Sequence, residues 1–540
     1  MAYVNYYDKH HQQQQQQPIC VINPSHFHPF YQHQQPIRLI NPIQFHRFLL
    51  HMEEKRTQSL IQFMTGEGLV PSQEEELKRK DVILKLKQIV MEWIHRVSWQ
   101  RQLTKEHILN SSATILTYGS YGLGVHGSDS DIDALCIGPC YASMDEDFFI
   151  VLRQILESRK EISELHCVKD AKIPLLRFKF DGIAIDLPYA QLKVMSVPEN
   201  VDILNQLFLT NIDETSWRCL SGVRANMRIL QLVPNLEKFQ LALRCLKLWA
   251  RRRGVYCNLV GFFGGIHLAV LTAFICRLFP NASGAALISK FFEIFAYWPW
   301  PTPVMLEDMI PPMNAEHSLM PIQFPSGTHE YCRSNFTKST FKKIRIEFLR
   351  GHTMTREILR PDFEWNILFE PYPYTKQHKR FVRIFIATTN QNQFGNWVGW
   401  IKSRFRSLLL KLEEVQGQCD PNPTEYIDVD EASPNVVFYW GLQPGRSGFT
   451  DIQSVEKYFR NYINNGYQGY KGRLEISIVE SSQLPKDAQS DYETGKESNG
   501  YWTYHGYIQP RAPIFSHYLP HYFVGYAAAK PAMDYPSSGF

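Results

Sequence analysis

The sequence predicts an α+β protein of several domains, and three observations lead to this fold class. A chain of 540 residues is too long for one ordinary hydrophobic core, so its length predicts about two to four domains. Strand-like and helix-like segments mix over residues 113–190 and 361–482, whereas helical patterns dominate from about 200 to 360. Hydrophobic residues make up 44% of the chain, which is enough apolar surface for most of it to fold.

The chain is expected to begin with a disordered arm that leads into a long helix. Residues 1–50 hold a glutamine run at 12–17 among His and Pro, and such a composition cannot bury enough apolar surface to offset its ordering entropy. From Gln73 to Val97 apolar residues recur at helical spacing. The apolar side of this helix is expected to comprise Val82, Leu84, Leu86, Ile89, Val90 and Trp93.

Three runs rich in β-branched and aromatic residues follow the helix and predict a mixed sheet. They are "ATILTYGS" (113–120), "DIDALCIG" (131–138) and "LLRFKFDGIAIDLPYA" (175–190). The third run contains Asp181–Gly182, a pair that favours a two-residue hairpin turn, so it is expected to form two antiparallel strands.

One apolar stretch raises the question of a membrane span. Residues 259–276, "LVGFFGGIHLAVLTAFIC", are interrupted by Gly264–Gly265 and His267, which leave a helix too short to cross a bilayer. We therefore expect a buried core helix and no membrane association. The ten cysteines lack zinc-ligand spacing, which argues against a zinc or disulfide framework and favours an intracellular protein. The net charge of +4 neither requires nor excludes nucleic acid.

The C-terminal part is expected to form a small α+β domain followed by a disordered tail. Its segments are, in order, strand-like "RFVRIFIATT", helix-like "WVGWIKSRFRSLLLKLEEV", strand-like "VVFYWGL", helix-like "IQSVEKYFRNYI" and strand-like "GRLEISIV". After Pro485 the chain is rich in Tyr, Pro and Gly and shows neither a helical nor a strand period.

The stretch "YGLGVHGSDSDIDALCI" (121–137) partly matches two known motifs, and the residues around it exclude both. Its glycines have the spacing of a dinucleotide-binding turn, but a polar and then strand-like segment with several carboxylates follows, where a helix facing phosphate is required. A calcium loop starting at Asp129 needs Gly at its sixth position and Glu at its twelfth, which are Ala134 and Cys140 here.

The acids of this stretch instead suggest a metal site for phosphate chemistry. Asp131 and Asp133 are two apart on a predicted strand and point to one face, and Asp186 interrupts a second, otherwise apolar strand. Three such carboxylates can hold two Mg²⁺ ions about 3.5–4 Å apart for in-line attack on a phosphate. Gly119 and Ser120 offer backbone N–H groups and a hydroxyl to phosphates. The alternative is a glycine-rich surface turn with solvated acids.

The pattern "GS…LGVHG…SDIDALCIG" followed by "DGIAIDLPYA" resembles the nucleotidyltransferase superfamily. Four further stretches resemble the eukaryotic poly(A) polymerases within it: "LALRCLKLWARRRGVYCNLVGFFGGIHLAVL", "FFEIFAYWPWPTPV", "LMPI" and "DIQSVEKYF". The likeness spans roughly Thr57 to Gln483. It implies a palm-like catalytic domain with a mixed sheet, a helical central domain and a ferredoxin-like (RRM-like) C-terminal RNA-binding domain.

The resemblance and the composition together set the expected domain boundaries. These are a disordered arm (1–50), an N-terminal helical segment packing with the central domain (51–79), a nucleotidyltransferase catalytic domain (80–193), a helical central domain (194–360), an RNA-binding domain (361–484) and a disordered tail (485–540).

The resemblance also implies the site residues. Asp131, Asp133 and Asp186 match the catalytic triad that binds two Mg²⁺ or Mn²⁺ ions, and the same three residues lie at the ATP. The other positions that match ATP contacts are Tyr118, Gly119, Ser120, Gly127, Ile132, Lys247, Tyr256, Gly265 and Ile266. The chain departs from the family pattern at Gly122, Ser221 and His267.

Basic residues supply two further predictions. On a helix through 241–253, Arg244, Lys247 and Arg251 form one cationic stripe, which is either a solvated face or, beside a metal site, a phosphate clamp. In the C-terminal domain the plausible RNA phosphate contacts are Arg380, Arg383, Lys402, Arg404, Arg406 and Lys411.

The function implied by the resemblance is template-independent addition of AMP from ATP to RNA 3′ ends, as in polyadenylation during mRNA processing. Two alternatives stay open: a catalytically impaired RNA-binding paralogue, and an RNA terminal transferase that uses another nucleotide such as UTP. The expected partners are the RNA 3′ end, ATP and RNA-processing factors, and the chain is expected to be a monomer.

The location predicted from the sequence is cytoplasmic, although nuclear is the default for the resembling family. Lys486, Lys496, Arg511 and Lys530 are isolated in the tail, and the run Arg251–Arg253 ends a predicted folded helix. A chain of 63.0 kDa should not diffuse freely into the nucleus. A nuclear pool carried in by partners is the alternative.

Overall fold

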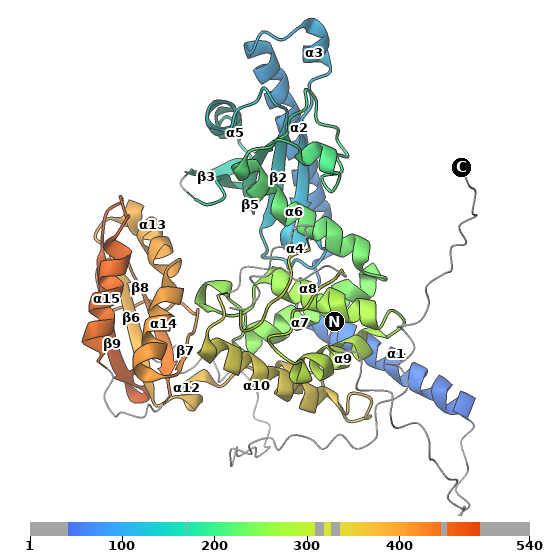
Figure 1. Cartoon of the computed structure of the whole chain (residues 1–540), viewed down its shortest axis with the longest axis vertical. Coiled ribbons are helices and arrows are strands. Elements are labelled where there is room, and N and C mark those ends of the chain that lie inside the picture. The colour runs from blue at the N-terminus through green and yellow to red at the C-terminus, as the bar shows by residue number, and fades with distance from the viewer. Residues whose placement is uncertain (1–41, 170, 308–317, 326–334, 444–450, 486–540) are drawn as a thin grey trace, which may run out of the picture. The chain divides into compact units, whose positions relative to one another are not determined.

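The computed structural model describes residues 42–169, 171–307, 318–325, 335–443 and 451–485 (Figure 1). The expected disordered tail, apart from its first residue, and residues 1–41 of the expected arm lie outside this part of the chain. Residues 42–50 are helical, so the expected arm does not extend to residue 50. The segment "PIQFHRFLL" starts helix α1 (Pro42–Gly66), with proline at the first helical position, where its missing N–H costs nothing.

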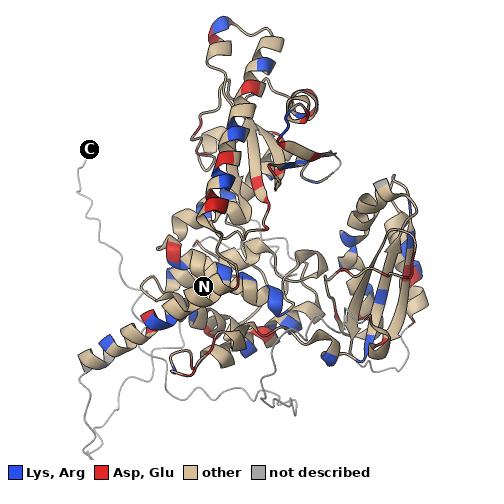
Figure 2. Ribbon diagram, turned by 180° about the vertical axis from the view of Figure 1, so that it is seen from behind, with Lys and Arg blue, Asp and Glu red and all other residues tan. Residues whose placement is uncertain are grey.

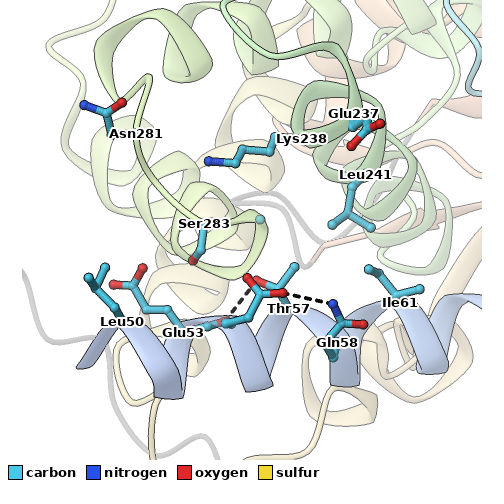
Figure 3. A pocket seen from close by; sticks show the side chains of 12 residues that line it. Leu50, Glu53, Thr57, Gln58, Ile61, Glu237, Lys238, Leu241, Asn281 and Ser283 are labelled. Carbon is cyan, nitrogen blue, oxygen red and sulfur yellow. Dashed lines mark hydrogen bonds between the residues drawn. The ribbon is translucent and has the colours of Figure 1, made fainter. Parts of the chain in front are cut away.

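Helix α1 is attached to the helical part of the protein by its second half. Leu60 and Met64 are fully buried, and Thr57 Oγ1 accepts a hydrogen bond of 3.1 Å from the backbone N–H of Ala285. Figure 3 shows Thr57 and Ile61 of α1 across an open cavity from Leu241, and this cavity of about 480 Å³ contains no residue predicted for the catalytic site.

The first sheet combines three predicted strand runs with one strand that was not predicted. Its strands, in the order β1-β2-β5-β4-β3, have the bounds β1 (Thr114–Tyr118), β2 (Ile132–Gly138), β3 (Ile162–Val168), β4 (Leu175–Phe180) and β5 (Ile183–Gln191). Strands β2 and β5 pair in parallel, and the other neighbours are antiparallel. The β4–β5 hairpin turns at Asp181–Gly182 as predicted, with both residues at positive φ.

Helices cover both faces of this sheet. Helix α2 (Gln73–Gln100) has a capping box of Ser72 and Glu75, and it shares a buried apolar cluster with the sheet. Leu84 is 59% exposed, so the prediction that it belongs to the apolar side of α2 was wrong. A second buried cluster joins the sheet to helix α6 (Glu214–Leu232), which lies beyond the boundary expected at residue 193.

Short helical elements connect the strands and the larger helices. They are α3 (Lys105–Leu109), α4 (Gly119–Gly122), η2 (Met144–Leu152), α5 (Arg153–Glu157), η3 (Gln206–Leu209), η4 (Asn258–Val260), α11 (Asn366–Phe369), α12 (Tyr374–Gln377) and η6 (Ser481–Gln483).

The central part is helical, as predicted. Its helices after α6 are α7 (Leu236–Arg252), α8 (Gly265–Leu278), α9 (Gly284–Tyr297) and α10 (Lys338–Thr355). Helix α8 begins at Gly265 within the apolar stretch and lies almost wholly in the core. Within the described ranges, none of the helices combines the length and the hydropathy that a bilayer span requires.

The C-terminal domain follows the order β-α-β-β-α-β when α13 and α14 are counted as one helical segment. Its elements are β6 (Arg380–Ala387), α13 (Gln391–Lys402), α14 (Phe405–Gln416), β7 (Cys419–Asp420), β8 (Asn435–Leu442), α15 (Ile452–Asn464) and β9 (Arg473–Glu480). The predicted single helix is divided in two, because Arg404 leaves the helical conformation. The sheet order β7-β8-β6-β9 agrees with the expected ferredoxin-like topology. Figure 2 shows basic and acidic residues interspersed along the helices.

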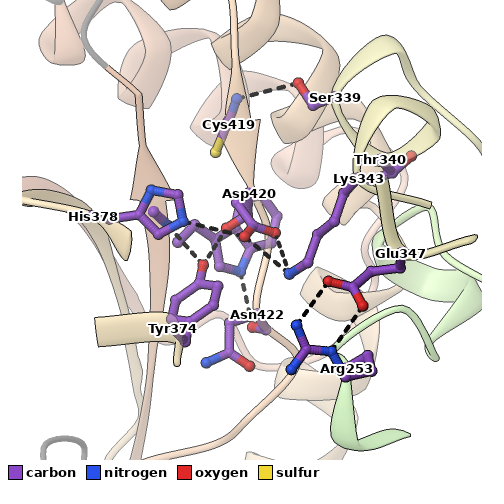
Figure 4. Close-up of polar contacts among 12 residues, drawn as sticks. Arg253, Ser339, Thr340, Lys343, Glu347, Tyr374, His378, Cys419, Asp420 and Asn422 are labelled. Carbon is purple, nitrogen blue, oxygen red and sulfur yellow. Dashed lines mark hydrogen bonds and ion pairs between the residues drawn. The ribbon is translucent and has the colours of Figure 1, made fainter. Parts of the chain in front are cut away.

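A buried polar network joins this domain to α10 (Figure 4). Lys343 Nζ lies 2.9 Å from both carboxylate oxygens of Asp420, and His378 Nε2 lies 3.2 Å from one of them. Beside it, Arg253 and Glu347 form a buried two-point ion pair with distances of 2.7 and 2.9 Å. Sequence patterns did not reveal these contacts, although a buried charge must be paired to be tolerated.

Candidate active site

Four polar residues form one row across the first sheet. In register, Tyr118 of β1 lies opposite Asp133 of β2, Asp133 opposite Asp186 of β5, and Asp186 opposite Arg177 of β4. Residues that are directly opposed on neighbouring strands point to the same face. The sheet therefore brings together two of the three predicted acids, the predicted aromatic residue and an arginine that sequence reasoning missed. Asp131 comes directly before β2.

The Gly-Ser turn lies against this row. Gly119 has a φ of +63°, and a Cβ atom there would stand 1.8 Å from Asp133 Oδ2, so only glycine permits this approach. The side-chain amide of Asn226 donates a 3.0 Å hydrogen bond to the Gly119 carbonyl. Sequence patterns missed Asn226 as well. The feature that could have revealed it is a polar residue on the otherwise apolar side of α6, where Asn226 is only 6% exposed.

The cationic stripe of α7 holds the loop that follows the Gly-Ser turn. Arg244 donates hydrogen bonds of 2.6 Å to the carbonyls of Gly124 and His126, and Lys247 Nζ donates one of 3.3 Å to that of Val125. A solvated basic face is therefore excluded for Arg244 and Lys247. Both side chains bring positive charge to the loop that leads into the acidic row.

Further predicted ATP contacts lie on this loop and its flanks. The Gly127 N–H donates a 2.9 Å hydrogen bond to Ser130 Oγ, and the Ser120 carbonyl accepts one of 2.9 Å from Val125. Ile132 is fully buried at the start of β2, so it contributes to the core beneath the site.

Tyr256 and the first turn of α8 form a second group of predicted contacts. A Cβ atom on Gly265 would stand 3.4 Å from the Tyr256 hydroxyl, and the guanidinium of Arg251 lies 5.4 Å from the centre of the tyrosine ring. Ile266 belongs to the same helical turn. Burial raises the pKa of Tyr256, although the neighbouring Arg251 acts to lower it.

The electrostatics of the row show an excess of negative charge. The pKa of Asp133 is raised to about 7, first by burial and then by Asp131 and Asp186. Burial, followed by Arg251 and Arg244, lowers the pKa of Lys247 to about 8. The positive charge of Lys247 lowers the pKa of Asp133, but burial and the two neighbouring acids outweigh it.

Three carboxylates are a donor set that Mg²⁺ and Mn²⁺ prefer, so the residues fit divalent metal. As the side chains lie, no group of three or more His, Cys, Asp or Glu residues in the described ranges is placed to hold an ion. Both oxygens of Asp186 instead face Arg177, whose pKa is raised chiefly by this interaction. Asp186 must exchange that partner to join Asp131 and Asp133 around a metal.

The three departures from the family pattern have internal roles. The Ser221 hydroxyl donates a 2.6 Å hydrogen bond to the Arg218 carbonyl, and His267 Nδ1 accepts one of 2.9 Å from the Gly264 N–H. Burial lowers the pKa of His267 to about 4, so the ring is neutral at pH 7. A Cβ atom at Gly122 would stand 2.8 Å from a carbonyl oxygen of β1.

Most of the basic residues expected to bind RNA phosphates have partners within the protein. These contacts are Arg383 with Asp428, Lys402 with Glu425, Lys411 with Glu414, and Arg404 stacked over Trp400. Arg406 is exposed and Arg380 is half-buried, so these two are better placed to meet a phosphate.

Comparison with known proteins gives two family models that match consecutive parts of the chain. The poly(A) polymerase nucleotidyltransferase domain matches residues 50–233, and the poly(A) polymerase central domain matches residues 238–371. The first model ends where α6 ends and so includes the helix that packs on the sheet.

Whole-chain relatives agree with these models. Nuclear poly(A) polymerase 3 of Arabidopsis thaliana is 55% identical over 87% of this chain and 93% of its own length. Nuclear poly(A) polymerase 2 of the same plant is 37% identical over 79% of this chain, which spans only 56% of that relative. Poly(A) polymerase PAPalpha of Candida albicans is 36% identical over 78% of this chain and 80% of its length. A solved cytoplasmic RNA terminal U-transferase aligns over 60% of this chain and 99% of its own, at 13% identity and a TM-score of 0.42.

The names of the relatives contradict the cytoplasmic location expected from the tail. Four Arabidopsis relatives are named nuclear poly(A) polymerases, so that expectation was wrong. Its basis was a count of basic residues, and such a count does not detect a bound carrier or a signal of another form.

Proposed function

This chain belongs to the poly(A) polymerase family, and from that premise we propose that it adds AMP from ATP to RNA 3′ ends without a template. The observation that carries the proposal is the row of Tyr118, Asp133 and Asp186 beside the Gly119–Ser120 turn. It combines carboxylates for metal with backbone and hydroxyl donors for a triphosphate.

Each part of the site has a role in this proposal. Asp131, Asp133 and Asp186 would hold two Mg²⁺ or Mn²⁺ ions, with Asp186 on the side of the attacking hydroxyl. When bound, such ions lower the pKa of that hydroxyl and stabilise charge on the triphosphate. The Gly119–Ser120 turn orients the phosphates, and Lys247 supplies positive charge to them.

The second group of residues would receive the rest of ATP. Tyr256, Gly265 and Ile266 lie close to one another, and an aromatic ring beside the start of a helix can hold a nucleoside. Tyr118, Gly127 and Ile132 flank the phosphates in the same proposal. We further infer a nuclear location from the names of the four Arabidopsis relatives. That the chain is a monomer and has RNA-processing factors as partners stays a proposal from the sequence.

Extension of a labelled RNA primer with each nucleoside triphosphate separately tests this function. We expect extension with ATP and little with the other three. Efficient extension with UTP alone would identify an RNA terminal transferase of another specificity. RNA binding without extension by any nucleotide would identify a catalytically impaired RNA-binding paralogue.

Replacement of Lys247 should weaken ATP use more than RNA binding. In Lys247→Ala the KM for ATP is expected to rise about tenfold, because a hydrogen bond to a charged group contributes about 1.5 kcal/mol or more. The Kd for primer should change less than about twofold. Lys238→Ala on the same helix is the control, since Lys238 lines the cavity against α1. Equal losses of ATP and RNA binding would contradict the assignment.

The pH dependence of the KM for ATP provides a second check on Lys247. Its pKa of about 8 means that the side chain is protonated at pH 7 and largely neutral at pH 9. The KM for ATP should therefore rise between pH 7 and pH 9 in the unmodified protein. A rise of equal size in Lys247→Met would assign the effect to another group.

The region 361–484 should contribute phosphate contacts to the RNA. Arg380→Ala combined with Arg406→Ala is expected to reduce the slope of log Kd against log salt by about 1.4, since each phosphate contact with single-stranded RNA contributes about 0.7. Lys290→Ala is the control, because Lys290 pairs with Glu293 in α9. Fluorescence anisotropy of a labelled primer at several salt concentrations measures the slope for the double variant and for the control. An unchanged slope would assign the face that carries these two arginines to protein partners.

A further inference from the structure

Arg177 is bound to Asp186, the third of the predicted metal ligands, by a two-point ion pair. Its Nε atom lies 2.7 Å from Asp186 Oδ1, and its Nη2 atom lies 2.7 Å from Oδ2. The two residues are direct partners in the antiparallel pairing of β4 with β5. A planar guanidinium that meets both oxygens of a carboxylate is the strong form of this interaction.

The surroundings make the ion pair reversible. The Arg177 side chain is 57% exposed, so water can solvate it once it leaves Asp186, whose side chain is 20% exposed. Asp133, the neighbour of Asp186 on its other side, has no such cation bound to it among the described residues. The arginine therefore neutralises Asp186 and leaves Asp131 and Asp133 to repel each other.

We propose that Arg177 is a positioning residue that holds Asp186 while the site is free of metal and is displaced from it when a divalent ion binds. This inference rests on the proposed function, which assigns Asp186 as a metal ligand. It follows that metal binding at this site competes with the ion pair. Removal of the guanidinium should strengthen metal binding, because the carboxylate then has no partner to give up.

A purely structural ion pair is the alternative, and the same strand offers a matched example of one. Lys179 of β4 pairs with Glu164 of β3 at 2.7 Å, and both side chains are exposed. Lys179 lies two residues from Arg177 on the same face of the strand, but it does not contact the acidic row. Lys179→Met therefore removes one positive charge near the site without changing the partner of Asp186.

Binding of Mn²⁺ to the full chain, measured by electron paramagnetic resonance without nucleotide or RNA, tests the inference. Arg177→Met should bind Mn²⁺ about three to ten times more tightly than the unmodified protein, and Lys179→Met should change the Kd less than about twofold. In the Asp186→Asn background, Arg177→Met should change the Kd by less than about twofold, because no ion pair is left to lose.

Each other outcome overturns the inference. An unchanged Kd in Arg177→Met would make the pair structural, and a weaker affinity would mean that Arg177 prepares Asp186 for metal. If Arg177→Met strengthened Mn²⁺ binding equally in the Asp186→Asn background, the gain would come from the loss of a positive charge near the site and not from the ion pair with Asp186. Absent Mn²⁺ binding would also refute it. Primer extension by the unmodified protein decides the proposed function separately, since AMP transfer with an unchanged Mn²⁺ affinity in Arg177→Met would refute only the role of Arg177.

Discussion

Asp133→Ala should lower the rate of AMP transfer to RNA at least about a thousandfold, which corresponds to about 4 kcal/mol of transition-state stabilisation. Asp131→Ala and Asp186→Ala should have losses of the same order, because each removes a carboxylate proposed to hold metal rather than a packing contact. Primer extension under single-turnover conditions measures the effect. A variant that retains normal extension would remove its residue from the site.

The same change at Asp133 should not destabilise the fold. Burial and the two neighbouring acids raise the pKa of Asp133, which means that its charged form is held at a cost in free energy. Thermal unfolding of Asp133→Ala without metal should therefore occur at the same or a higher temperature. Asp129→Ala is the matched control, since Asp129 is an exposed acid of the same loop and should retain both activity and stability.

Asp420→Ala should lower the free energy of unfolding by about 3–5 kcal/mol, the usual effect of removing one partner of a buried ion pair. The substitution leaves Lys343 buried without its carboxylate and removes the acceptor of His378. Denaturant unfolding followed by tryptophan fluorescence measures the loss. Glu414→Ala is the control, because the pair Lys411–Glu414 is at the surface and contributes at most about 1 kcal/mol.

The pH dependence of stability provides a second test of Asp420. Burial alone would raise its pKa, but Lys343 and His378 outweigh burial and lower it. An acid with a lowered pKa stabilises the fold above its unfolded pKa of about 3.9 and loses that contribution as the pH falls through the folded value. The difference in stability between the protein and Asp420→Ala should thus be constant near pH 7 and shrink below about pH 4. A difference already lost by pH 6 would contradict this account.

Part of the site could be predicted because local rules fix it. The Asp181–Gly182 turn determines the register of its hairpin, so Arg177 had to lie opposite Asp186 once that turn was accepted. The spacing of Asp131 and Asp133 and the position of the Gly-Ser turn could also be read from neighbouring residues in the sequence. The alternation of polar and apolar residues in β4 did not identify Arg177 as a site residue, because an arginine is common on the exposed face of a strand.

The remaining features depend on contacts that no local pattern encodes. Asn226 binds the Gly119 carbonyl across 107 positions of the chain, and Lys343 meets Asp420 across 77. Strand β3 was missed because Ser163, Glu164 and His166 break up its apolar residues and its pairing is interrupted by a register shift at the edge of the sheet. Tertiary packing decided these cases.

Transfer of label from ATP to RNA shows directly whether this protein adds AMP to RNA 3′ ends. The full chain is mixed with Mg²⁺, an RNA primer that carries a 3′-hydroxyl, and ATP labelled at either the α- or the γ-phosphate. We expect the α-label to enter the RNA, the γ-label to leave as pyrophosphate in equal amount, and a 3′-deoxy primer to accept no label. Absence of α-label from the RNA, or release of γ-label as inorganic phosphate, would contradict it.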